Sequence, residues 1–170
     1  NFVKRLLGRL VFLYFLQKKH WLGASNKNYA DGDTNFLYNL FNYDQDSKDH
    51  FYKKWLSKLF FNALNTPNRN NDGFELPNGT NVCVPFLNGG LFEEGQEPEK
   101  HKDIYFPPTL FDLLFKFFNG YNFTIYENSP EDHTVAVDPE MLGHIFENLL
   151  EDNKDKGAFY TPKEIVHYMT

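Results

Sequence analysis

Apolar positions recur along this chain mainly at the spacing of α-helices. Residues 2–20 contain a segment that is apolar on every side, which predicts a helix buried by its neighbours. Thr34 is the predicted N-cap of a short second helix, and Ser47 is predicted to open a third. The predicted core residues of these two helices are Phe36, Leu37, Leu40, Phe41, Phe51, Trp55, Leu59 and Phe60.

The middle of the chain alternates between polar stretches and short apolar runs. Residues 65–79 are polar and are predicted to form an exposed loop. A short strand is predicted within residues 80–86, with Val82 and Val84 on one face. A helix should then begin at Pro107–Pro108 and end at Gly120. Its apolar residues are Leu110, Phe111, Leu114, Phe117 and Phe118.

The last third predicts a hairpin and the most regular helix of the chain. Residues 123–126 and 134–137 alternate in polarity as the two strands of a hairpin do. Residues 139–151 separate apolar and polar side chains onto opposite faces of a helix. The apolar face holds Met141, Leu142, Ile145, Phe146, Leu149 and Leu150, and the polar face holds His144, Glu147, Asn148 and Glu151. The fold class predicted from these patterns is mainly α: a compact helical bundle with one or two small β-hairpins.

Composition indicates a folded, cytoplasmic segment. The 19 Phe and 10 Tyr predict a bulky, well-filled interior. The single cysteine, Cys83, has no partner for an internal disulfide, which favours a reducing compartment. The longest apolar run, residues 10–16, is too short to cross a bilayer. Because the chain opens without Met and stops within a predicted helix, we expect it to be a piece of a longer protein.

The net charge of −6 is unevenly placed. Residues 1–20 hold five basic residues and no acidic one, so they contribute +5 and the remaining chain contributes −11. A basic helix can follow the phosphates of DNA. The alternative, which we favour, is that this charge forms a solvated face or a docking surface for a neighbouring domain. The basic residues are Lys4, Arg5, Arg9, Lys18 and Lys19.

Residues 157–164 form a pattern typical of a helix N-terminus. Thr161 is the predicted N-cap, Pro162 suits the first helical position, and Glu164 completes a capping box. The free amides and the positive end of the helix dipole at such a position suit a carboxylate or a phosphate. An ordinary capped helix explains the same pattern.

Three sequence blocks resemble a known class of enzyme. Residues 157–166, Gly-Ala-Phe-Tyr-Thr-Pro-Lys-Glu-Ile-Val, resemble the segment that opens the methyltransferase domain of gamma-class adenine-N6 DNA methyltransferases. Residues 84–93, Val-Pro-Phe-Leu-Asn-Gly-Gly-Leu-Phe-Glu, and residues 135–150 resemble the same enzymes, in particular type IIG restriction–modification proteins and related large single-chain DNA methylases. The order and spacing of the blocks match the connector that precedes the catalytic domain.

The resemblance implies a division of the chain and a function. Residues 1–155 would be a helical connector domain, and residues 156–170 the truncated start of a methyltransferase domain. The parent protein would methylate adenine N6 at a specific DNA site, with or without a fused endonuclease, in a restriction–modification or related phage-defence system. This segment would contact neighbouring domains and form the first wall of the S-adenosylmethionine pocket. The residues implied for that wall are Gly157, Ala158, Phe159, Tyr160, Thr161 and Pro162.

The sequence also lacks motifs that these enzymes need. It contains no Gly-rich cofactor turn, no Asn/Asp-Pro-Pro-aromatic motif for a flipped adenine, and no Glu-x-Lys of a metal-dependent nuclease. One cysteine and scattered histidines predict no metal site. We therefore expect no catalytic residue in this segment and no activity from it alone. A stand-alone helical module that binds protein or nucleic acid remains the alternative, and the next part of the parent gene would discriminate between the two.

Gly89–Gly90 has a structural and a functional interpretation. Two glycines permit backbone angles that other residues avoid, after which Leu91 and Phe92 would hold the turn to the core. The resemblance implies a recurring connector element here, but no chemical role. We favour the structural interpretation.

Overall fold

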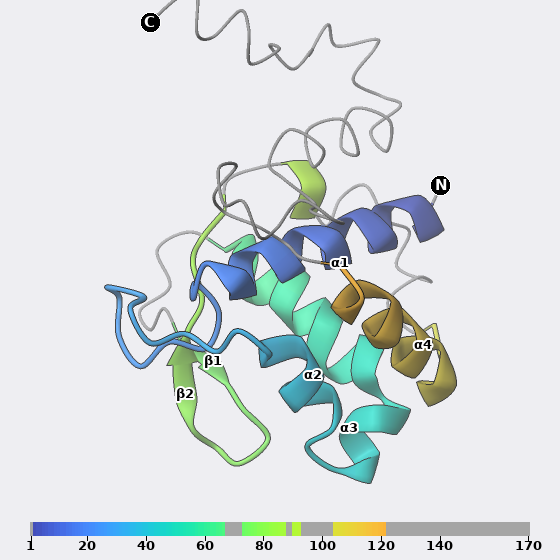
Figure 1. Cartoon of the computed structure of the whole chain (residues 1–170). Helices are drawn as coiled ribbons and strands as arrows, with labels where there is room; N and C mark the ends of the chain where they lie inside the picture. The colour runs from blue at the N-terminus through green and yellow to red at the C-terminus, as the bar shows by residue number, and fades with distance from the viewer. Residues whose placement is uncertain (1, 67–72, 88–89, 93–103, 122–170) are drawn as a thin grey trace, which may run out of the picture.

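Helix α1 (Phe2–Lys18) lies across the other elements of the described structure (Figure 1). The computed structural model describes residues 2–66, 73–87, 90–92 and 104–121. Buried α1 residues occur around most of its circumference, which confirms the helix predicted to be covered by neighbours. They are Leu6, Gly8, Arg9, Leu10, Leu13, Tyr14, Phe15, Leu16 and Gln17.

Two short helices follow a loop, and their caps differ from the prediction. Helix α2 (Phe36–Phe41) has Asn35, not Thr34, as its N-cap, and Asn35 makes no side-chain capping bond. Instead the Leu37 N–H donates to Oε1 of Gln17, a buried residue of α1, at 3.2 Å. The acceptor for this helix terminus therefore comes from another element, which a local capping rule does not detect.

Helix α3 (Gln45–Asp49) begins earlier than predicted. Its N-cap is Asp44, whose Oδ1 accepts the Ser47 N–H at 2.7 Å. Ser47 lies inside the helix and is only 1% exposed. An aspartate three residues before a buried amide is an N-cap of the usual kind, so the predicted opening at Ser47 is wrong.

Residues 51–64 form two π-helices, η1 (Phe51–Leu56) and η2 (Lys58–Leu64), joined at Ser57. The Ser57 N–H donates to Tyr52 O, five residues back. The four apolar pairs in this stretch repeat every four residues. They are Phe51–Tyr52, Trp55–Leu56, Leu59–Phe60 and Ala63–Leu64, and all are buried. A repeat of four exceeds the 3.6 residues per turn of an α-helix, so a widened helix keeps all four pairs toward the core.

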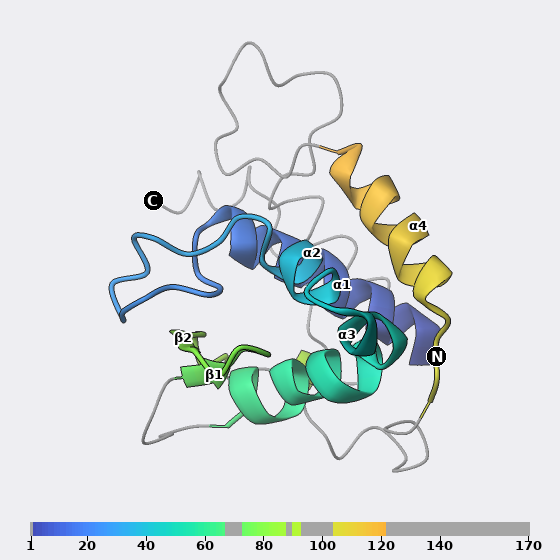
Figure 2. The same cartoon turned by 90° about the horizontal axis from the view of Figure 1, so that it is seen from below.

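A two-stranded antiparallel hairpin lies at the end of the helical layer opposite α3 and α4 (Figures 1 and 2). Strand β2 (Asn81–Cys83) is the strand predicted within residues 80–86. Strand β1 (Gly73–Glu75) lies in a stretch predicted to be loop, and Phe74 pairs with Val82. The predicted exposed loop is thus wrong at residues 73–75, because Phe74 packs at 5% exposure against the rings of Phe36 and Trp55.

Helix α4 (Pro108–Asn119) confirms the predicted helix, with Pro107 as N-cap and Gly120 as C-cap. Its buried residues Phe111 and Phe115 join the rings of Phe41 and Phe51. Ring centroids lie 4.9 Å apart for Phe51 and Phe111, 5.1 Å for Phe41 and Phe51, and 5.3 Å for Phe41 and Phe115. This aromatic cluster connects α2, η1 and α4 and fills the interior that the composition predicted.

The mainly α-helical fold with a small hairpin is confirmed for the described residues. The predicted hairpin of residues 123–126 and 134–137, and the helix of residues 139–151, lie outside them. Among the described helices, none combines the length and the apolar character that a membrane span requires.

Truncation of the aromatic cluster should destabilise the whole described unit. Phe51 is 1% exposed and its ring contacts Phe41, Phe111 and Phe115. We expect Phe51→Ala to lower the free energy of unfolding by about 3–5 kcal/mol, because it removes apolar burial and leaves a cavity. Tyr43→Ala, at a site that is 50% exposed, should change it by less than about 0.5 kcal/mol. Urea unfolding of the two variants measures the difference, and equal losses would contradict this view of the core.

Candidate functional site

The six residues implied for a cofactor wall, Gly157 to Pro162, lie outside the described residues. Their assignment therefore stays a prediction. Of the three blocks that carry the resemblance, the structure describes most of the one at residues 84–93, namely residues 84–87 and 90–92. The contacts of these residues are therefore the part of the candidate site that the structure describes.

Residues 84–92 run from the hairpin back onto the helical core. Val84 follows β2 and is fully buried, and the Leu87 N–H donates to the Leu64 carbonyl at the end of η2 at 2.7 Å. A turn of 3₁₀-helix, η3 (Gly90–Phe92), then places the Phe92 ring in the core at 2% exposure. The Phe92 ring centroid lies 5.7 Å from that of Phe60. The part of the structural interpretation that concerns Leu91 and Phe92 is confirmed, because both pack on the core; the part that concerns Gly89 lies outside the described residues.

Arg9 holds the same turn from the other side. Its Nε donates to the Leu91 carbonyl at 2.7 Å, and its side chain is 1% exposed. The guanidinium carbon lies 5.3 Å from the centroid of the Phe60 ring and 5.0 Å from that of Phe61. A buried charge is costly unless hydrogen bonds and polarisable groups surround it. Arg9 therefore connects α1, η2 and η3 at one buried point.

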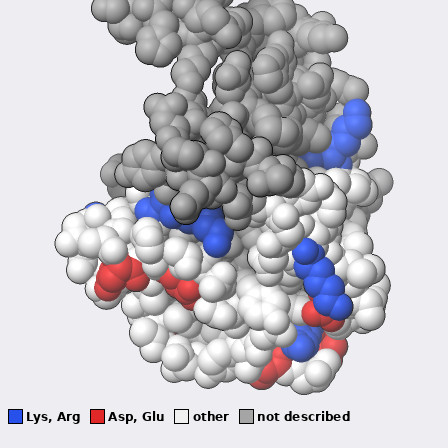
Figure 3. Space-filling model, viewed as in Figure 1, with Lys and Arg blue, Asp and Glu red and all other residues white. Residues whose placement is uncertain are grey.

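This position of Arg9 changes the interpretation of the basic helix. Arg9 cannot contact a phosphate, whereas Lys4 and Lys19 are exposed. On the face that Figure 3 shows, the visible Lys and Arg side chains lie in separate groups, some of them beside acidic side chains. The arrangement favours the docking or solvated surface over a track for phosphates.

Sequence reasoning counted Arg9 with the surface charge and missed its role. The sequence did contain an indication that Arg9 is buried, because Arg9 lies three residues after Leu6 and four residues before Leu13. These spacings place it on the same side of the helix as two buried leucines. A basic residue within an apolar stripe predicts a buried partner.

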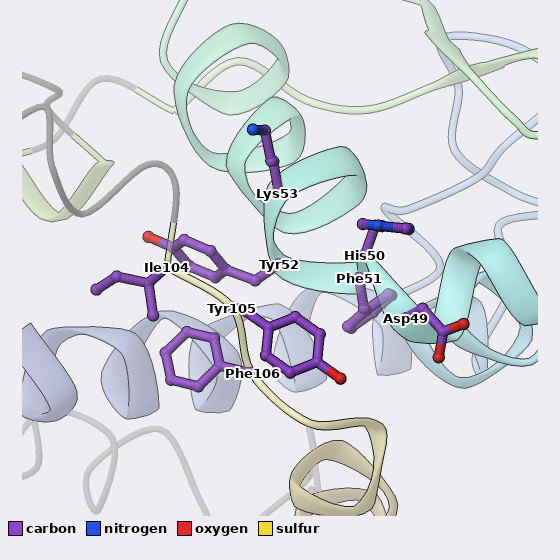
Figure 4. A pocket seen from close by; sticks show the side chains of 8 residues that line it. All are labelled: Asp49, His50, Phe51, Tyr52, Lys53, Ile104, Tyr105 and Phe106. Atoms are coloured by element: carbon purple, nitrogen blue, oxygen red, sulfur yellow. The ribbon is translucent and has the colours of Figure 1, made fainter.

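A small hollow lies between η1 and the segment that leads into α4 (Figure 4). Its volume is about 170 Å³, below the ~300 Å³ at which ligand pockets usually begin. The rings of Tyr52, Tyr105 and Phe106 lie together in its middle, while Lys53 points away from them. The hollow therefore has room for one protein side chain and not for a nucleoside-sized cofactor.

A second hollow of about 200 Å³ lies between α2 and the turn of the hairpin. Its acidic residue, Asp33, already accepts the Asn35 N–H and the Asn39 side-chain amide, both at 2.8 Å. Asp33 thus fixes the loop before α2. Its two carboxylate oxygens serve the local structure, so the hollow has no charged group directed at a ligand.

The titratable groups with shifted pKa values are also explained by local structure. Burial raises the pKa of the Tyr14 phenol. The hydrogen bond from Lys54 lowers the pKa of Asp46, which also accepts from His50. Among residues 2–66, 73–87, 90–92 and 104–121, no group of three or more His, Cys, Asp or Glu could hold a metal ion. In this part of the chain the two pKa shifts thus reflect burial and local hydrogen bonds.

Comparison with known proteins gives one informative similarity. The chain is 28% identical, over 177 aligned positions, to a protein of Methanocaldococcus jannaschii whose name describes it, as a prediction, as a type II restriction enzyme and methyltransferase. The alignment covers 99% of this chain and 14% of that protein, so the chain spans about one seventh of the relative's length. No protein-family model and no solved structure matches the chain.

Removal of the Arg9 guanidinium should loosen the turn at residues 90–92. Arg9→Met keeps most of the side-chain volume but removes the donor to the partly buried Leu91 carbonyl. We expect a loss of about 2 kcal/mol in the free energy of unfolding. Relative to the unsubstituted protein, amide hydrogen exchange should accelerate at Leu91 and Phe92 more than it does in α4. Lys19→Met, at an exposed position just after α1, is the matched control and should have little effect. Unchanged exchange at residues 90–92 in Arg9→Met would contradict the proposed anchoring.

Proposed function

We propose that this chain is the connector that precedes and opens the methyltransferase domain of a restriction–modification protein. The observation that carries the proposal is the similarity to the M. jannaschii protein, which extends over 99% of this chain. The relative is much longer than the aligned region, which leaves room in it for separate catalytic domains. The three sequence blocks support the same assignment independently of that protein's name.

The geometry of the described part supports a mechanical role. Its aromatic cluster joins α2 and η1 to α4, and Arg9 fixes the block at residues 84–92 to α1. The two small hollows are both below the size of a cofactor pocket. A rigid unit of this kind is suited to setting the position of one domain relative to another.

The finer part of the proposal concerns the reaction of the parent protein. We infer that it transfers a methyl group from S-adenosylmethionine to N6 of adenine in a specific DNA sequence, as type IIG proteins do. This inference rests on residues 157–166 and their order relative to the two earlier blocks. Enzymes that act on a DNA base take the base out of the stack into a pocket. The motifs for that pocket are absent from this sequence, so the chemistry belongs to other parts of the protein.

The proposed share of this chain in cofactor binding is one wall of the site. S-adenosylmethionine supplies the methyl group when it is bound. At the predicted helix N-terminus, the Thr161 hydroxyl and the amides after it would combine hydrogen-bond donors with a helix dipole, which would suit the carboxylate of the methionine moiety. Phe159 and Tyr160 would offer flat apolar surfaces beside it. Gly157, Ala158 and Pro162 would shape the approach of the backbone.

The cofactor wall can be tested in the intact parent enzyme. The double substitution Tyr160→Ala with Thr161→Ala should raise the dissociation constant of S-adenosylmethionine roughly tenfold or more, because it removes a hydrogen bond to a charged group and an apolar contact. Isothermal titration calorimetry measures the constant, and circular dichroism checks that the fold is retained. His167→Ala, further along the same predicted helix, is the control. Unchanged cofactor affinity would reduce residues 157–162 to an ordinary helix cap.

The 170-residue chain itself should bind DNA weakly and without sequence preference. Its net charge is −6, and one of the five basic residues in the region of α1 is buried. Non-specific complexes at physiological salt usually have dissociation constants of ~1–100 μM, and we expect a value in or above that range. Fluorescence anisotropy with labelled duplexes of several sequences provides the test. A sequence-specific submicromolar complex would show that this segment carries a recognition surface and does more than connect domains.

A further inference from the structure

Helix α4 carries two apolar stripes, of which the described residues cover one. The inner stripe, Phe111, Phe115 and Phe118, is buried: Phe111 and Phe115 lie in the aromatic cluster, and Phe118 packs on Tyr14 of α1. On the outer side, Leu113 is 64% exposed and Phe117 is 58% exposed. In both views, α4 lies at the edge of the described part, and no other described element covers its outer side (Figures 1 and 2).

The outer stripe differs from the scattered apolar residues found on any protein surface. Leu113 and Phe117 are four residues apart and therefore adjacent on one helix face. The half-buried Leu110 and Leu114 flank them, and the Tyr121 ring lies 4.9 Å from that of Phe117. The apolar surface of α4 extends well beyond its buried stripe, and the polar side of the helix is formed by Thr109, Asp112, Lys116 and Asn119. The outer stripe of α4, defined by Leu113, Phe117 and Tyr121, therefore lacks a cover within the described part.

The sequence of this chain contains a segment suited to cover it. Residues 139–151 predict a helix with six large apolar residues on one face, and that face also requires a partner. It is the next predicted helix after α4, and residues 120–138 separate the two. These 19 residues, which include the predicted hairpin, are long enough to return the chain to the side of α4.

We propose that the helix predicted at residues 139–151 docks its apolar face onto the outer stripe of α4. The docking would pair two surfaces that are each incomplete and that belong to one chain. It rests on the α4 geometry and on the spacing of residues 139–151, and it is independent of the methyltransferase proposal. If the docking and the cofactor wall are both correct, residues 157–162 follow six residues after a helix that is fixed to α4. The aromatic cluster, which holds α4, would then also limit where the cofactor wall can lie.

Paired cysteines in the full chain test the docking directly. In a Cys83→Ser background, Phe117→Cys is combined in turn with Leu142→Cys, Ile145→Cys, Phe146→Cys or Leu149→Cys on the apolar face. The matched controls are Phe117→Cys with His144→Cys, Glu147→Cys, Asn148→Cys or Glu151→Cys on the polar face. Disulfides need Cβ atoms about 3.5–4.5 Å apart, so mild oxidation should give an intramolecular crosslink with at least one apolar-face position and with none of the controls. Crosslinks on both faces alike, on neither face, or only between two molecules would overturn the proposal.

A thermal double-mutant cycle on the same chain gives a second readout. Phe117→Ala and Ile145→Ala should each lower Tm by several degrees, and the double variant should lower it by clearly less than the sum, because both remove the same contact. Val3→Ala, at a site on α1 that is 62% exposed, is the control and should hardly move Tm. An unchanged Tm for Phe117→Ala, or fully additive losses, would count against residues 139–151 as the occupant.

Discussion

Burial of α1 is the constraint on which the rest of the described structure depends. The helix is apolar around most of its circumference, yet it takes Arg9 and Gln17 into the interior with it. Each of these needs a polar partner, and each finds one in a distant segment: the Leu91 carbonyl for Arg9 and the Leu37 amide for Gln17. A shift of α1 by one turn, about 5.4 Å, would break both of these contacts. Apolar contacts alone tolerate such shifts much better, so the two polar contacts set the register of the fold.

The aromatic cluster converts this fixed register into a rigid body. Phe41, Phe51, Phe111 and Phe115 come from three separate elements, and their rings meet mostly edge to face or tilted. Such arrangements have preferred distances and angles, so the helices cannot turn against one another without losing them. The proposed connector role depends on this rigidity, because a flexible unit would leave the relative position of the domains it joins undefined.

Long, strongly patterned elements could be predicted from the sequence, and contacts between elements could not. The apolar runs of α1 and α4 and the proline and glycine that bound α4 predicted both helices. The cap of α2 was predicted wrongly at Thr34, because its acceptor comes from Gln17 on another helix. Phe74 lies in a three-residue strand, which is too short to show alternation before its partner is known. In the candidate site, Arg9 was predicted to lie on the surface because it is charged. Its position on the same side of α1 as the buried Leu6 and Leu13 was not taken into account.

The Tyr14 contacts have a consequence for how this segment is made. The ring of Tyr14 in α1 is covered by Phe115 and Phe118 of α4, with centroids 6.3 and 4.8 Å away, although α1 is translated first and α4 last among the described elements. At ~5–20 residues per second, α1 emerges on the order of ten seconds before its cover does. During that time the Tyr14 side of α1 is without its α4 cover and is accessible to chaperones and to other nascent chains. The pairing of the first and last described helices thus makes the completion of this unit a late event in its synthesis.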